Sequence, residues 1–162
     1  MALSVRVALA CASLLCAVTL VSSPIVAQSE NGLVTEPSNN PVAVTIDRFE
    51  TAVKEAGMKV FARIDHAAAA TEAGLAMPPA TVIIFGAPRG GTPNFLKAPT
   101  LAIDLPLKAL VWQDAAGKVF ITYNSGAYVG KTVFPRHGLP AAPDGGAGQE
   151  KLLAGFAAAA AR

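Results

Sequence analysis

Two consecutive segments with the patterns of β-strands constrain the fold of this chain most. Residues 58–65 alternate between two sets of side chains, which predicts a strand with one face on the core. The two faces are Met58, Val60, Ala62 and Ile64 on one side and Lys59, Phe61, Arg63 and Asp65 on the other. Residues 81–85 form a continuous β-branched and aromatic run, which predicts a central strand buried on both faces.

The remaining pattern predicts an α+β protein. Residues 107–113 and 118–123 are typical of two strands joined by a turn at Gly117, and residues 33–36 can add a short strand. Helical patterns cover residues 45–55 with Thr45 as the N-cap, 66–73, 92–98, 124–133 and 149–162. We therefore expect a mainly antiparallel or mixed sheet of about four strands.

The first 27 residues have the features of a secretory signal peptide. Arg6 precedes an apolar run over residues 7–21, and Ala27 is a small residue at a plausible cleavage point. A membrane anchor is the alternative, but the run is shorter than the roughly 20 apolar residues that span a bilayer. A lipid-modified Cys fits less well. Cys11 has almost no apolar region before it, and Cys16 follows Leu15, which is too large for the cleavage that lipid modification requires. We expect a periplasmic or secreted protein with no stable membrane anchor after cleavage.

Cleavage limits the chemistry of the mature chain. It leaves 135 of the 162 residues, and both Cys residues of the chain are removed. Disulfides, Cys-ligated metals and a Cys nucleophile are then excluded. Without Arg6, 12 basic residues face 11 acidic residues, a net charge of +1. Nucleic-acid binding usually requires a clustered basic face, so we expect no nucleic-acid partner.

The composition also suggests how the mature chain is divided. Residues 28–41 are polar and are predicted to be a flexible segment, and residues 42–140 form a single α+β domain. A linker rich in Pro and Gly over residues 141–148 leads to an Ala-rich helix over 149–162. Because a four-stranded sheet has two edges that must be covered or paired, we expect a homodimer.

Three motifs carry a resemblance to a known family. They are residues 62–67 (Ala-Arg-Ile-Asp-His-Ala), Phe85-Gly86 with Gly91-Thr92-Pro93, and residues 104–108 (Asp-Leu-Pro-Leu-Lys). With them the chain resembles domain of unknown function family 302. The resemblance implies helices on one face of a curved sheet, similar to the TATA-binding-protein-like layout, and implies no settled activity. The chain departs from the family pattern at Ala87, Arg89 and Gln113.

Asp65 and His66 are the first candidate site residues. A His beside a carboxylate can act as a general base. The alternative is structural: Asp65 lies where a strand becomes a helix, so its carboxylate can cap the amide of Ala67 or Ala68.

The Gly-rich segment over residues 86–92 is the second candidate. A strand, a Gly-rich loop and a helix N-terminus can present backbone N–H groups to an anion at Gly91 and Thr92, with Arg89 as a clamp. The spacing matches neither a nucleoside-triphosphate loop nor a dinucleotide fingerprint. The alternative is a turn that needs glycine for positive φ.

Two further polar pairs complete the candidates. Asp104 and Lys108 flank Pro106 and can meet at a sheet edge, although an exposed ion pair is the plainer interpretation. Arg136 and His137 follow Pro135 in a loop. Two His with Asp65 or Asp104 would satisfy a metal site, but no closely spaced ligand pair supports one, and we expect neither metal nor cofactor.

These observations favour a small-ligand-binding or partner-binding accessory protein, with a small anionic ligand as the candidate. The expected pocket gathers the polar motif residues beside the sheet: Asp65, His66, Arg89, Gly91, Thr92, Asp104, Lys108, Arg136 and His137. The alternative is an enzyme that uses His66 or His137 as a general base on an anionic small molecule. The sequence leaves open whether the protein is catalytic.

Overall fold

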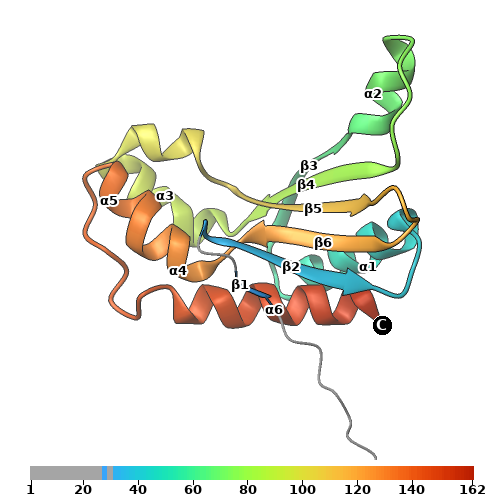
Figure 1. Cartoon of the computed structure of the whole chain (residues 1–162). Helices are drawn as coiled ribbons and strands as arrows, with labels where there is room; N and C mark the ends of the chain where they lie inside the picture. Colours follow the sequence, from blue (N-terminus) through green and yellow to red (C-terminus); the bar gives the residue numbers. More distant parts are fainter. Residues whose placement is uncertain (1–26, 29–30) are drawn as a thin grey trace, which may run out of the picture.

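The computed structural model describes residues 27–28 and 31–162, so most of the predicted signal peptide lies outside the described residues (Figure 1). The strands are β1 (Ala27–Gln28), β2 (Leu33–Ser38), β3 (Lys59–Asp65), β4 (Ala80–Gly86), β5 (Leu107–Gln113) and β6 (Val119–Asn124). The longer helices are α1 (Val42–Glu55), α2 (His66–Glu72), α3 (Pro88–Lys97) and α6 (Ala147–Ala161). Short helical turns are η1 (Pro99–Ile103), α4 (Gly126–Tyr128), η2 (Val129–Val133) and α5 (Phe134–Arg136).

One antiparallel sheet organises the protein, which confirms the α+β prediction. Its strand order is β1-β2-β6-β5-β4-β3, with every neighbouring pair antiparallel. The sheet has more strands than the expected count of about four, and the short strand expected over residues 33–36 is present as β2, so residues 33–38 belong to the sheet rather than to a flexible segment. Strand β2 pairs with β6 along its whole length, and Val34 is fully buried.

Helices α1 and α6 pack side by side on one face of the sheet (Figure 1). Three rings pack edge to face at the centre of the core: the centroid of Phe49 lies 5.4 Å from that of Phe85 and 5.8 Å from that of Phe156. Since Phe156 belongs to α6, this helix is part of the domain rather than an appendage behind a linker. The predicted domain limits of 42 and 140 were therefore too narrow at both ends.

Helix α1 begins at Val42, three residues before the predicted N-cap. Thr45 is fully buried inside the helix, and its hydroxyl donates to the carbonyl of Pro41. Such a bond from a threonine to the carbonyl four residues earlier belongs to a helix interior. The predicted helix over residues 45–55 is confirmed, and its buried side chains include Ile46, Phe49 and Val53.

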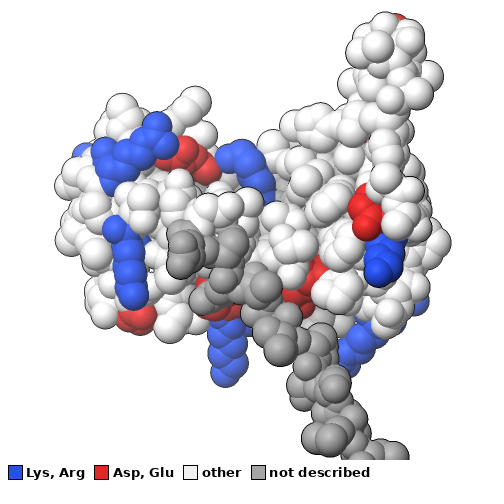
Figure 2. All heavy atoms as spheres, viewed as in Figure 1, with Lys and Arg blue, Asp and Glu red and all other residues white. Residues whose placement is uncertain are grey.

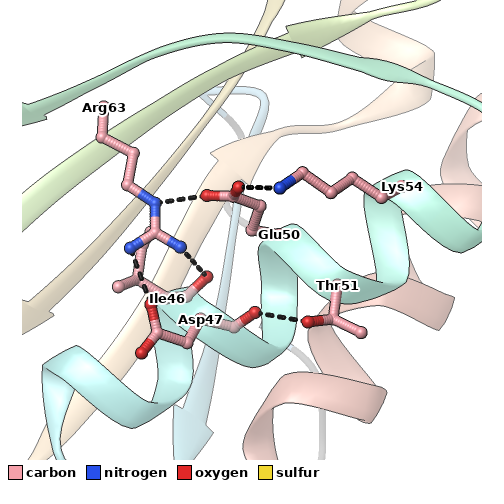
Figure 3. Close-up of polar contacts among 6 residues, drawn as sticks. All are labelled: Ile46, Asp47, Glu50, Thr51, Lys54 and Arg63. Carbon is pink, nitrogen blue, oxygen red and sulfur yellow. Dashed lines mark hydrogen bonds and ion pairs between the residues drawn. The ribbon is translucent and has the colours of Figure 1, made fainter.

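A β-bulge changes the orientation of β3 halfway along. The pairing with β4 shifts between Val60 and Ala62, so Val60 packs on the core while Ile64 is 42% exposed. The bulge inserts one residue, which reverses the faces predicted by simple alternation. Arg63 consequently lies over α1, where its guanidinium donates to the carboxylates of Asp47 and Glu50 (Figure 3).

Strand β4 is buried on one face only, which corrects the prediction of a strand covered on both. Ile83 and Phe85 are fully buried against the helices, whereas Val82 and Ile84 are partly exposed. Among the described residues, α1 and α6 cover a single face of the sheet. The apolar side chains on the other face of β4 are therefore not covered by these helices.

The β3–β4 connection projects from the body as an arm, residues 66–79 (Figure 1). It contains α2, close to the predicted helix, and no residue of α2 is buried. Leu75 and Met77 are 68% and 42% exposed. The arm thus has no core of its own within the described structure.

At the opposite end of the sheet, α3, η1, α4, η2 and α5 form a lobe (Figure 1). Helix α3 begins at Pro88, not at the predicted Thr92, and it includes Pro93. Pro88 is well suited to a first helical turn, where its missing N–H costs nothing. The lobe has a small core of its own around Leu101, Val129 and Val133.

Candidate functional site

The lobe brings together four of the predicted site residues. Asp104 follows η1, Lys108 lies in β5, and Arg136 and His137 end the α5 turn. The imidazole Nε2 of His137 lies 2.7 Å from Oδ2 of Asp104, and Nη1 of Arg136 lies 3.2 Å from the same oxygen. We call these residues, together with Thr100, the Asp104 cluster.

Burial and charge make the Asp104 cluster more than a surface ion pair. The side chain of His137 is 6% exposed and that of Asp104 25%, whereas that of Arg136 is 62% exposed. The hydrogen bond from His137, followed by the charge of Arg136, holds the pKa of the Asp104 carboxyl below its ordinary value. Asp104 is therefore ionised at neutral pH.

Lys108 contacts the same turn through the backbone. Its ammonium donates to the carbonyl oxygen of Asp104 at 2.9 Å. The predicted pairing of Asp104 with Lys108 is thus wrong in detail, since the ammonium binds the main chain and leaves the carboxylate to His137 and Arg136. Through this hydrogen bond Lys108 stabilises the turn that contains Asp104.

Thr100 is a member of the Asp104 cluster that the sequence patterns did not single out. Its hydroxyl lies 2.9 Å from Nδ1 of His137, on the opposite side of the ring from Asp104. Thr100 lies in η1 and is exposed. No spacing rule joins residues 100, 104 and 137, because the contact depends on how the lobe folds.

Asp65 and His66 lie elsewhere, at the base of the arm. Oδ1 of Asp65 accepts a hydrogen bond from the amide of Ala68 at 3.0 Å and so caps α2, as the structural alternative predicted. His66 is exposed at the first position of α2. The structure therefore does not gather all the motif residues in one place.

Arg89, Gly91 and Thr92 are part of helix α3 rather than of an open loop. The amides of Gly90 and Gly91 donate to the carbonyl of Ala87, so the glycines form the first helical turn. These two amides are thereby occupied, which removes them from the predicted anion cradle. Arg89 and Thr92 are exposed on the surface of the helix.

A mainly apolar hollow lies between α3, α5 and the start of α6, and we call it the lobe groove. Its volume is about 300 Å³. The walls are mainly apolar, and Gly91 is the one predicted site residue that lines it. The principal apolar side chains are Phe61, Phe95, Leu105, Pro106, Phe134 and Leu152.

Polar groups in the lobe groove are few. Asn94 and Gln149 reach its lining, and Nε2 of Gln149 is buried without a hydrogen-bond partner in the described structure. A buried donor without a partner costs about 1–3 kcal/mol.

A second, smaller cavity of about 110 Å³ lies beside the Asp104 cluster. Asp104 and Lys108 line it, and Leu105 and Leu107 line both this cavity and the lobe groove. These two leucines therefore form the wall between the apolar hollow and the charged residues.

Charged and metal-ligating side chains are not concentrated at one place in the described part of the chain. In the view of Figure 2, basic and acidic side chains are scattered and form no large patch of one sign. Over residues 27–28 and 31–162, no group of three His, Cys, Asp or Glu side chains gathers in a way that could hold a metal ion. Within the same part of the chain, no helix has the length and apolar character needed to cross a bilayer.

The comparisons with known proteins establish the family. The model of the family described as Domain of unknown function DUF302 matches residues 34–156. The chain belongs to this family. The match begins within β2 and ends within α6, in agreement with a domain that includes both elements.

A solved structure supports the fold. The crystal structure of an uncharacterised conserved DUF302 protein from Bacillus stearothermophilus aligns with a TM-score of 0.65 over 81% of this chain and 98% of that one. The sequences are 22% identical, so this likeness concerns the fold alone.

Curated relatives carry a different kind of name. The chain is 43% identical over 121 residues to the protein named fluoride-specific ion channel FluC 1 of Brucella suis, and equally to FluC 2 of Brucella melitensis. The matched part is 75% of this chain but 46% and 43% of those proteins. The chain thus spans less than half the length of the relatives that bear the channel name.

Proposed function

We propose that this protein is an accessory domain that binds a small ligand in the lobe groove and works outside the cytoplasm. The mainly apolar hollow of about 300 Å³ between α3, α5 and the start of α6 is the observation that carries the proposal. A mainly apolar pocket with few polar groups is the usual form of a small-molecule site. Export is supported by Arg6 and the apolar run that follows it.

The chemistry of the lobe groove selects the ligand. The apolar walls favour a compact apolar body, and the amide side chains of Asn94 and Gln149 in the lining favour a carbonyl or carboxylate oxygen. Lys59 lies near the Phe61 wall, with Nζ 5.2 Å from the centroid of that ring. The proposed ligand is a small apolar acid, which keeps the expectation of an anion but moves it away from the predicted polar pocket.

An accessory role agrees with the relatives. Proteins named fluoride-specific ion channels contain a region similar to this chain together with about as much sequence again. A domain that can be joined to a membrane transport protein suits a ligand-sensing or partner-binding task. Fluoride transport itself is not part of the proposal for this chain.

A thermal-shift screen tests the proposal. Small apolar carboxylic acids should raise the melting temperature of the protein, and a ligand at 100 times its Kd stabilises by about 2.7 kcal/mol. Gln149→Leu and the groove-filling Leu152→Trp should reduce the shift, whereas the matched control Leu75→Trp on the arm should not. Equal shifts in all variants, or no shift with any acid, would contradict it.

The proposed assembly is a homodimer. Strand β3 is an edge of the sheet, and its Phe61 and Ile64 are 46% and 42% exposed. Free backbone groups on an edge strand promote pairing with another strand. Light scattering should give twice the chain mass for the mature protein, and Arg63→Pro at this edge should give a monomer. A monomeric parent protein would contradict this assembly.

A second candidate function is catalysis with His137 as the general base. The 2.7 Å contact between its ring and Asp104 favours His137. His66 is less suitable, because it is exposed at the base of the arm. A ring held by a carboxylate is oriented to accept a proton at its other nitrogen. The comparison of His137→Gln with His66→Gln tests this role in any activity assay.

A further inference from the structure

Thr100, His137 and Asp104 form a continuous chain of hydrogen bonds from two separate stretches of sequence, because Thr100 lies in η1 and Asp104 directly follows it. The hydroxyl of Thr100 is 2.9 Å from Nδ1 of His137, and Nε2 of the same ring is 2.7 Å from Oδ2 of Asp104. A hydroxyl, a base within hydrogen-bond reach and a third group that orients the base are the signature of an activated nucleophile.

The protonation of the ring follows from the carboxylate. Ionised Asp104 can only accept hydrogen bonds, so Nε2 of His137 carries the proton on that side. In the neutral ring Nδ1 is then a bare acceptor that faces the Thr100 hydroxyl. This is the tautomer that allows His137 to take the hydroxyl proton.

The surroundings of Thr100 leave room for a reacting molecule. The threonine is exposed, while the ring behind it is 6% exposed and therefore fixed in place. Arg136 is 62% exposed and contacts Asp104 through one of its terminal nitrogens. The other N–H groups of its guanidinium are donors for a developing oxyanion. Ile103, 75% exposed in the same turn, offers an apolar contact for a short acyl group.

We propose that Thr100 is the nucleophile of a hydrolase site for small carboxylic esters. The Thr100 oxygen forms a bond to the ester carbonyl carbon as its proton moves to Nδ1 of His137. The bond from that carbon to the alcohol oxygen breaks, and the alcohol leaves with the proton from Nδ1. A water molecule then attacks the acyl carbon and loses a proton to Nδ1, which passes it to the departing Thr100 oxygen.

This inference goes beyond ligand binding in the lobe groove, and it rests on the second candidate function for its base. The net reaction is ester plus water to acid plus alcohol, with no other reactant. Thr100 is exposed, so we expect weak substrate affinity and a preference for short acyl groups.

The test uses p-nitrophenyl acetate with the full-length protein. Wild type should release p-nitrophenolate faster than the His137→Gln variant, by about 100-fold or more, the range typical of general-base catalysis. Thr100→Val should lose activity to a similar degree, whereas Thr100→Ser should retain it. The matched controls Thr71→Val and His66→Gln, both on the arm, should be unchanged.

A covalent readout separates a nucleophile from a structural threonine. Acid quenching during turnover, followed by tandem mass spectrometry, should locate the acetyl group on Thr100 of wild type, and this measurement stands even if Thr100→Val fails to fold. Full activity in Thr100→Val with loss in His137→Gln would overturn the nucleophile and leave the general base, whereas an acetyl group on His137 would make that ring the nucleophile and overturn both roles. A wild-type rate equal to that of His137→Gln would overturn both.

Discussion

The arm and the lobe each contain an aspartate and a histidine, and the two pairs behave differently. Asp65 and His66 adjoin in sequence, yet the carboxylate of Asp65 binds the backbone of α2 and His66 is exposed. Asp104 and His137 are 33 positions apart, yet their side chains meet at 2.7 Å. The two residues that adjoin in sequence therefore provide only a helix cap. The pair that could take part in catalysis is formed by residues that the fold brings together.

The difference comes from what lies behind each pair. The lobe has a buried core of its own, and η1 and α5 are both anchored to it. The arm has no buried residue in α2 to hold its side chains in a fixed arrangement. A site needs rigid support, so the Asp104 cluster is the better candidate, and the following predictions test this contrast in decreasing order of effect.

Close packing at the junction of lobe and body gives the largest predicted effect. A Cβ added to Gly126 would lie 2.2 Å from the carbonyl oxygen of Gly146 and 2.5 Å from the amide nitrogen of Glu150. Because backbone atoms cannot yield easily, Gly126→Ala should lower the free energy of unfolding by about 3 kcal/mol. Urea denaturation measures this change.

Two matched glycines sharpen the packing comparison. Gly155 lies inside α6 with no atom within 4 Å of an added Cβ, so Gly155→Ala should stabilise by about 0.5–1 kcal/mol. Gly74 on the arm has φ +73°, and Gly74→Ala should strain only the local turn. If Gly126→Ala cost no more than Gly74→Ala, the lobe would not be packed against α6 as described.

Removal of each aspartate tests the two pairs directly. Asp104→Ala leaves the nearly buried ring of His137 without its acceptor and should cost about 2 kcal/mol, the usual value for a hydrogen bond to a charged group. Asp65→Ala removes a helix cap worth about 1 kcal/mol, but only for the arm. Calorimetry should show a lower melting temperature for the first variant and little change for the second. Equal decreases in melting temperature for the two variants would contradict the proposed difference between the two aspartates.

The pH dependence of Asp104 is a smaller effect with a definite sign. The folded pKa of this carboxyl is held below its unfolded value, first by His137 and then by Arg136. The contribution of the ionised Asp104 to the free energy of unfolding is therefore complete above the unfolded pKa, near 3.8. This contribution is lost as the pH falls through the folded pKa. The difference in unfolding free energy between wild type and Asp104→Asn should be constant at pH 5–6 and should narrow below about pH 4. Parallel curves down to pH 2 would show that the carboxylate gains nothing from its partners.

Local patterns predicted most of the fold. The existence of strands β3 and β5, the Gly117 turn with φ +83° and the apolar face of α1 are each determined within a few residues. The errors came from effects at longer range. The β3 bulge is visible only in the pairing with β4, and β2 is held by β6, which lies far along the chain.

The candidate site was less predictable than the fold for the same reason. Polar residue types identified Asp104, Arg136 and His137, but no local signal showed that these would meet. Thr100 has an ordinary sequence context, and its hydroxyl matters only because the lobe places His137 beside η1. The lobe groove was missed because its apolar walls have the composition of an ordinary core.

Removal of the arm should have the smallest effect on stability. Residues 66–79 can be replaced by Asn-Gly, which with Ala80 makes a three-residue hairpin loop, because Asp65 pairs with Thr81. Since α2 buries no residue, the melting temperature should change by only about 2–3 °C. Differential scanning calorimetry measures the stability, and light scattering follows the proposed dimer. A much larger loss of stability in a monomeric sample would mean that the arm supports the domain, whereas loss of the dimer alone would assign its exposed Leu75 and Met77 to the assembly.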